Sequence, residues 1–179
     1  MTRTPRWLLA LLLALLPAVA FATPPFTLDS PTLTAGGAMP LVNVYTQCGG
    51  GNRSPKLRWH HPPPGTKSFA VTMFDTDANF WHWIAFDIMV GAHGLNADAG
   101  QPHSGNPPGD MVQLKNGFGN TGYSGPCPPP GAPHHYVITA YALDVPELGL
   151  LAHFSRDDAL AAIHRHTLAK ATLTVTWGR

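Results

Sequence analysis

The side chains best suited to chemistry stand at the ends of three apolar segments. Asp75 and Asp77 follow the first segment, His82 begins the second, and His134 and Tyr136 begin the third. A protonated histidine can pair with an anion, a tyrosine hydroxyl can donate a hydrogen bond, and a carboxylate can hold an imidazole protonated and oriented. Together these residue types favour a small polar pocket for a phosphate-like or carboxylate group.

Taken one at a time, the same residues have ordinary structural explanations. His82 on an apolar strand would be a core histidine satisfied by hydrogen bonds, and Asp75 and Asp77 would be turn carboxylates. The convergence of several such groups from separate segments favours a binding site.

A loop rich in glycine and proline leads into the third segment. Residues 122–136 read GYSGPCPPPGAPHHY, with five prolines that fix φ and remove N–H donors, and three glycines that permit close approaches. This composition predicts a binding loop of fixed shape rather than a linker. Few N–H groups remain, and we expect that of Cys127 to be free to face a ligand.

Strands are the main elements that must position these groups. Alternating apolar residues predict strands over 67–77, 81–90, 137–143 and 171–177. In the first strand, Asp75 and Asp77 would continue the face of the alternate apolar residues. In the second strand, His82 would share a face with Ile84, Phe86 and Ile88.

One helix is expected late in the chain. Residues 155–158 resemble a capping box, and the apolar spacing that follows predicts a helix to about Leu168. Residues 91–110 carry turn residues without a periodic pattern, which favours a long surface excursion. The expected fold class is mainly β, a sandwich of two antiparallel sheets with a late α-helix.

The N-terminal residues 1–22 have the pattern of a secretory signal peptide. Arg3 and Arg6 precede a short apolar run, and small residues allow cleavage after Ala20 or Ala22. An uncleaved anchor is the alternative. We expect a single mature domain, residues 23–179, located in the periplasm or secreted.

The net charge of the mature chain is too small to attract nucleic acid over a long range. Removing Arg3 and Arg6 from the 11 Lys and Arg leaves nine against 10 Asp and Glu, a formal charge of −1 with neutral histidines. An anion must therefore be held by local geometry. The two cysteines of an exported chain, Cys48 and Cys127, predict one disulfide, with two free thiols as the alternative.

Several motifs in order make the chain resemble the phosphatidylethanolamine-binding protein family, specifically its bacterial Raf kinase inhibitor-like branch. The matching pieces span residues 26–177 and include NRSPKLRW at 52–59, GTKSF at 65–69, DTDA at 75–78, WHW at 81–83 and the loop ending in HHY at 134–136. The resemblance implies a Greek-key β-sandwich with an anion pocket. It places ligand-binding roles on Asp75, Asp77, His82, His134, Tyr136 and the backbone near Cys127.

Two departures from the family pattern lie beside the expected pocket. The usual Asp-Pro-Asp-Ala-Pro reads Asp-Thr-Asp-Ala-Asn at 75–79, and the usual His-Arg-Tyr reads His-His-Tyr at 134–136. The first removes two rigid prolines and the second removes a fixed positive charge.

The function expected from residues and resemblance is binding without catalysis or a cofactor. The ligand would be a small phosphate-like anion or a phospholipid head group. The alternatives are an inhibitor of a protease or other protein partner, with residues 91–110 as the contact surface, and a hydrolase that uses histidine and aspartate. A mixed metal site of His82, His134 and an aspartate stays open, although no metal is expected. Bacterial relatives suggest a homodimer.

Overall fold

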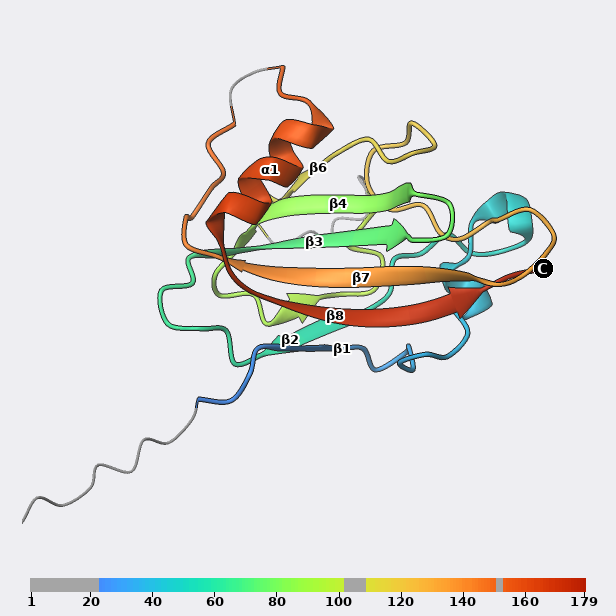
Figure 1. Ribbon diagram of the computed structural model, residues 1–179, viewed down its shortest axis with the longest axis horizontal. Coiled ribbons are helices and arrows are strands. Elements are labelled where there is room, and N and C mark those ends of the chain that lie inside the picture. Colours follow the sequence, from blue (N-terminus) through green and yellow to red (C-terminus); the bar gives the residue numbers. More distant parts are fainter. Residues whose placement is uncertain (1–22, 102–108, 151–152) are drawn as a thin grey trace, which may run out of the picture.

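Two antiparallel sheets form the framework of the protein (Figure 1). The computed structural model describes residues 23–101, 109–150 and 153–179. The predicted signal peptide therefore lies outside the described residues. One sheet has the order β1 (Thr27–Asp29), β2 (Leu57–His60) and β5 (Gly94–Leu95). The other has the order β6 (Val112–Gln113), β4 (Phe80–Met89), β3 (Ser68–Asp75), β7 (His134–Leu143) and β8 (Thr167–Trp177).

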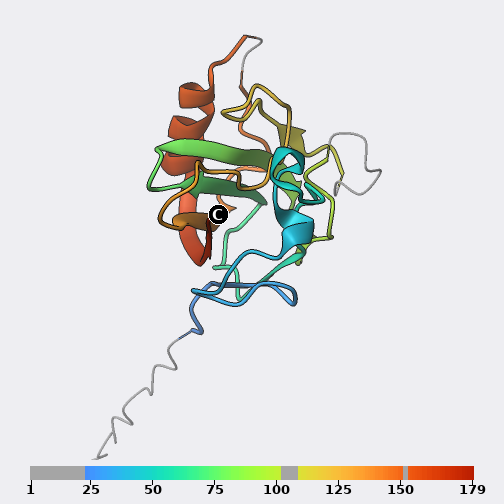
Figure 2. The same ribbon diagram turned by 90° about the vertical axis from the view of Figure 1, so that its right-hand side faces the viewer.

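The core is divided into two layers by the five-stranded sheet. Between the sheets lie large buried side chains such as Trp59, Phe69 and Trp83. On the opposite face, helix α1 (Arg156–His166) covers a second apolar cluster that includes Ile84. Figure 2 shows α1 on one side of this sheet and the blue and cyan N-terminal part of the chain on the other. The predicted class, a mainly β sandwich with a late helix, is confirmed.

Helix α1 begins where the sequence predicts and ends earlier. The Ser155 side chain accepts a hydrogen bond from the Asp158 N–H, and the Asp158 carboxylate accepts one from the Ser155 N–H, which completes a capping box. The helix stops at His166 and not near Leu168, because Thr167 is extended and pairs with Leu143 as the first residue of β8. Sheet pairing therefore overrides the apolar spacing at this end.

Strand β4 does not keep one face from end to end, so the predicted shared face is wrong. Its pairing with β3 shifts at two places, and each shift leaves an extra residue on β4. Ile84 and Phe86 pack under α1, whereas Ile88 packs between the sheets. His82 is the extra residue between Trp83 and Trp81, and its ring lies beside Tyr136 on the inner side. A bulge re-aims a side chain in this way, and period-2 reasoning cannot anticipate it.

The segment 91–110, predicted as a surface excursion, is partly built into the core. Leu95 belongs to β5 and is 1% exposed, and Ala99 is fully buried. Gly94 allows this pairing, because a Cβ there would lie 2.1 Å from the Leu57 carbonyl oxygen. Residues 102–108 of the excursion lie outside the described part of the chain.

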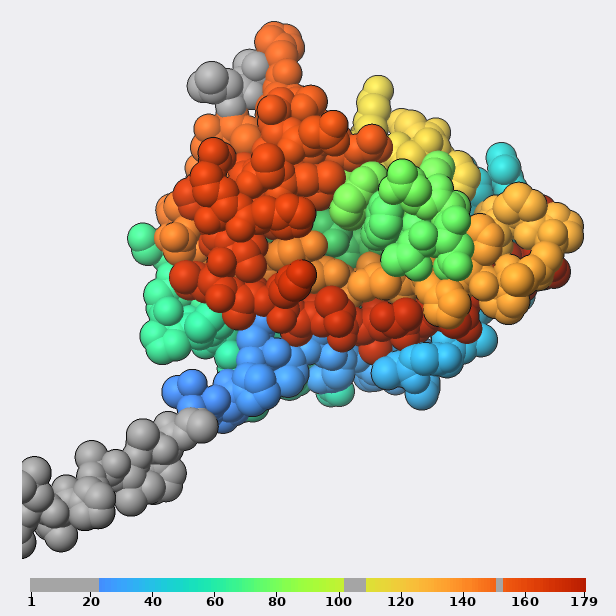
Figure 3. Space-filling view, in the orientation of Figure 1, coloured from blue at the N-terminus to red at the C-terminus, as the bar shows by residue number. Residues whose placement is uncertain are grey.

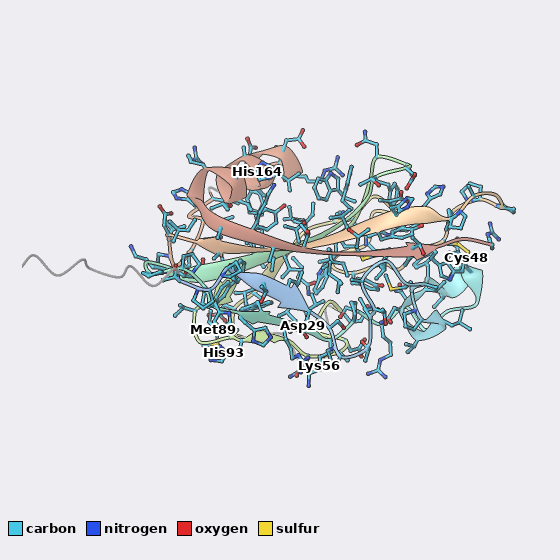
Figure 4. The ribbon with its side chains drawn as sticks, turned by 60° about the horizontal axis from the view of Figure 1, so that its bottom comes forward. Asp29, Cys48, Lys56, Met89, His93 and His164 are labelled. Carbon is cyan, nitrogen blue, oxygen red and sulfur yellow. A yellow bond between two sulfur atoms is a disulfide. The ribbon has the colours of Figure 1, made fainter. Side chains whose placement is uncertain are left out.

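A disulfide joins the loop of residues 122–136 to the early part of the domain. Cys48, at the end of the short 3₁₀ helix η2 (Thr46–Cys48), is bonded to Cys127 across 79 positions of sequence. A second 3₁₀ helix, η1 (Leu41–Asn43), lies just before it. Figure 4 labels Cys48 at the end of the sandwich. None of the described helices has the length and apolarity needed to cross a membrane.

Candidate functional site

A cavity of about 150 Å³ lies where β3 ends and β4 and β7 begin. Its walls come from the ends of these strands and from two loops. The lining residues are Asp75, Ala78, Phe80, His82, Phe118, Cys127, Pro128, Pro129, His134 and Tyr136. Five of the six side chains or backbone sites predicted for a ligand thus meet in one place.

Asp77 is the predicted site residue that the structure places outside this cavity. Strand β3 ends at Asp75, and the chain turns there, so the alternation does not continue. The exposed Asp77 carboxylate accepts hydrogen bonds from the His135 N–H at 2.6 Å and lies 3.0 Å from the His135 Nδ1. These contacts hold the pKa of Asp77 below its usual value, chiefly through the backbone hydrogen bond from His135.

The buried carboxylate of Asp75 organises one wall of the cavity. Its Oδ1 accepts hydrogen bonds from the N–H groups of Asp77 and Ala78, both at 3.0 Å. Its Oδ2 lies 2.8 Å from the Nδ1 of His134. Because a carboxylate accepts, the His134 proton sits on Nδ1, and the Nε2 of this ring is left for other partners.

His82 is the more buried of the two histidines of the site, with 2% of its surface exposed. Its Nδ1 donates to the carbonyl oxygen of Ser124 at 2.7 Å, so the neutral ring has an unprotonated Nε2. Burial lowers the pKa of His82, and the contact with Ser124 and the charge of Asp75 oppose this only in part. The free pocket therefore favours a neutral His82 near neutral pH.

Two donors of the cavity have no partner among the described residues. The Tyr136 hydroxyl is buried without a hydrogen bond. Burial, the negative charge of Asp75 and a weak interaction with its nearby carboxylate, outside hydrogen-bonding distance, raise the pKa of Tyr136, so this group keeps its proton. The Cys127 N–H also donates to none of the described groups, and its flanking residues are prolines without N–H groups. An unpaired buried donor costs about 1 to 3 kcal/mol, which a ligand atom would recover.

Sequence reasoning missed the aromatic and polar neighbours that shape the site. Phe80 and Phe118 pack edge to face with ring centroids 4.7 Å apart and close one side of the cavity. The Asn116 side chain donates to Ser124 Oγ at 2.9 Å and so helps to fix the residue that orients His82. Phe80 directly precedes the predicted second strand, a signal that could have found it. Phe118 and Asn116 lie in an irregular segment whose pattern gives no such signal.

The described residues contain no group of three or more His, Cys, Asp or Glu side chains arranged to hold a metal ion. In the mixed set that the sequence left open, one nitrogen of His134 is directed at Asp75 and one nitrogen of His82 at a carbonyl oxygen. The cavity offers the Tyr136 and Cys127 donors and two ring nitrogens that become donors on protonation, within largely apolar walls.

The fold and the site define a class of protein: β-sandwiches with a small pocket at one end of the sheets. Comparison with known proteins identifies the family. The phosphatidylethanolamine-binding protein family model matches residues 29–178. The chain belongs to the phosphatidylethanolamine-binding protein family, as its sequence motifs indicate.

Relatives of similar length support this assignment. The UPF0098 proteins YbcL and YbhB of Escherichia coli K12 are each 35% identical to the chain, over 156 and 153 residues. These alignments cover 83% and 82% of the chain, and 85% and 96% of the relatives.

Solved structures show the same fold. The crystal structure of Escherichia coli YbcL, described as a new member of the mammalian PEBP family, matches with a TM-score of 0.80 and 33% identity, covering 86% of this chain and 98% of that one. A phosphatidylethanolamine-binding protein homologue from Chlamydia trachomatis matches with a TM-score of 0.71 and 28% identity, over 87% and 98% of the two chains.

Proposed function

We propose that this chain is an exported binding protein, not an enzyme, whose pocket takes a small phosphate-like anion or the head group of a phospholipid. The observation that carries the proposal is the buried hydroxyl of Tyr136, a residue that lines the cavity, because this hydroxyl has no partner within hydrogen-bonding distance among the described residues. A protein retains such an unpaired donor at a cost, and an anionic oxygen is the partner that best repays it.

The other groups of the cavity suit the same ligand. The Cys127 N–H and the Nε2 atoms of His82 and His134 can add hydrogen bonds around one anion, provided that the rings take up protons. The volume of about 150 Å³ is below the roughly 300 to 1,000 Å³ of pockets for drug-sized ligands. A head group suits this volume, and an acyl chain does not.

Binding is favoured over catalysis by the residues that line the cavity. The sulfur of Cys127 is held in the disulfide, and the described residues that line the walls include no serine, threonine or lysine. The pair of Asp75 and His134 resembles a base with its orienting group, but the described residues of the wall place no serine, threonine or free cysteine beside it. Export is supported by the signal-like residues 1–22 and by the disulfide, which suits an oxidising compartment.

Calorimetric titration of the mature, oxidised protein with inorganic phosphate and phosphoethanolamine tests the proposal. Both should bind at one site, and Tyr136→Phe should weaken binding. Tyr141→Phe is the matched control, because Tyr141 lies in the cluster under α1. Sedimentation with vesicles of phosphatidylethanolamine and phosphatidylglycerol separates the two ligand sources. Binding of neither soluble anion nor vesicles, or equal binding by wild type and Tyr136→Phe, would refute the assignment.

A further inference from the structure

A second, open cavity of about 450 Å³ adjoins the candidate anion pocket. The two cavities share three wall residues, Ala78, Pro129 and His134. The rest of the second wall comes mostly from Pro130, Gly131, Ala132 and Pro133, which we call the proline basin. A molecule held in the anion pocket therefore has an adjoining surface for any part that extends past His134.

The basin is rigid before any ligand arrives. Its prolines have fixed φ angles. The end of the chain braces the segment on both sides of Pro129 and Pro130, because Arg179 donates from Nε to the Pro128 carbonyl at 2.9 Å and accepts from the Gly131 N–H at 3.1 Å. Figure 1 shows the chain end, marked C, beside this orange loop. A preformed surface costs little ordering entropy when a ligand binds.

The chemistry of the basin is apolar. Proline and alanine side chains make most of its wall, and Asp77 is the one carboxylate among the described residues there. That carboxylate already accepts a hydrogen bond from the His135 N–H and lies 3.0 Å from the His135 Nδ1. It is therefore occupied by groups of the protein itself. A phosphate ester whose phosphoryl group lies in the first cavity would bind more tightly if its short carbon substituent were buried here.

We infer that the proline basin is a specificity subsite for the short alkyl or aryl substituent of a soluble phosphate monoester, whose phosphoryl group lies in the anion pocket. The inference rests on the proposed function for the phosphoryl group. It adds the class of ligand, since inorganic phosphate would leave the basin empty.

Calorimetric titration with inorganic, methyl, butyl and benzyl phosphate tests the subsite. Butyl and benzyl phosphate should bind about five- to tenfold more tightly than methyl phosphate, as expected when a few carbon atoms are partly buried. Ala132→Trp, which fills the basin without touching the first cavity, should remove this preference and leave affinity for inorganic phosphate within about twofold of wild type. Ala161→Trp, an exposed alanine on α1, is the matched control and should keep the preference.

The outcomes separate this inference from the proposed function. Equal affinity for all four phosphates, or a preference that survives Ala132→Trp, would overturn the subsite and leave the anion pocket intact. Tighter binding of phosphoethanolamine than of butyl phosphate would assign the basin to a cation and overturn its apolar role. Binding of phosphatidic acid vesicles in preference to butyl phosphate would also overturn it. If no phosphate binds, the proposed function fails and the subsite with it.

Discussion

At the scale of the residue, the site depends on groups held away from their usual states. Tyr136 keeps a buried hydroxyl without a hydrogen bond to any described residue, and His82 is held neutral by burial. Both are unfavourable in an empty pocket and become favourable around an anion. Two variants separate this cost in stability from the gain in binding.

Replacing Tyr136 with phenylalanine should move stability and affinity in opposite directions. The unfolding free energy should stay unchanged or rise by about 1 kcal/mol, because the variant removes an unsatisfied buried hydroxyl. Affinity for phosphate should fall roughly tenfold or more, the loss expected for a hydrogen bond to a charged group. Urea denaturation and calorimetry measure the two effects. A large loss of stability would show that the hydroxyl has a structural partner.

The lowered pKa of His82 makes a prediction about pH. The unfolded chain binds a proton near the ordinary pKa of about 6.5, whereas the folded ring binds it only at lower pH. Stability from this group is therefore complete above about pH 6.5 and is lost as the pH falls toward the folded pKa. Between about pH 7.5 and 5, the unfolding free energy of His82→Gln should therefore fall less than that of the wild type. An unchanged pH profile would contradict this, and His164→Gln on α1 serves as the control.

At the scale of the element, strand ends and bulges decide which side chains meet. The sequence predicted the strands that carry Asp75 and His82, because alternation over several residues is a strong signal. It placed His134 and Tyr136 just ahead of a strand at 137–143, whereas β7 begins at His134. It could not predict the bulge that turns His82 to the inner side, or the turn at Asp75 that leaves Asp77 outside. These depend on pairing with distant residues, as does the buried Leu95 within a turn-rich segment.

The capping box of α1 supports the outer face of the sheet, away from the pocket. Ser155→Ala removes the side-chain acceptor for the Asp158 N–H and should cost about 1 kcal/mol of unfolding free energy. Phosphate affinity should not change, because α1 packs on the other side of the sheet. Ser155→Thr, which keeps a hydroxyl that can accept from the Asp158 N–H and donate to the Asp158 carboxylate, should restore stability. A loss of phosphate affinity in Ser155→Ala would mean that the helix and the pocket are coupled.

At the scale of the whole molecule, the disulfide ties the pocket loop to the sandwich. Figure 3 shows the orange-red atoms of α1 and β8 and the green atoms of the β3–β4 region covering one face. The loop lies at the end of this body, and Cys127 joins it to Cys48. The pairing was predictable because the sequence has two cysteines, whereas the bracing by Arg179 was not.

Removing this cross-link should destabilise the fold. In the loop-entropy account, closing 79 positions is worth about 4 kcal/mol, because it restricts the unfolded chain. The double variant Cys48→Ser and Cys127→Ser should lose about this much unfolding free energy, which urea denaturation measures as a lower midpoint. An unchanged midpoint would mean that the other loop contacts, such as the Tyr45 N–H to the Pro126 carbonyl, suffice.

The most direct test of the central claim is calorimetric titration of sulfate, a phosphate-like anion that does not titrate in this range, at pH 5.5 and 7.5, each in two buffers of different ionisation enthalpy. If the histidines take up protons to hold the anion, binding is tighter at pH 5.5, and at pH 7.5 its heat depends on the buffer. The double variant His82→Ala and His134→Ala should then show no binding. Binding that is independent of pH and buffer, or that survives in the double variant, would contradict a histidine-held anion pocket.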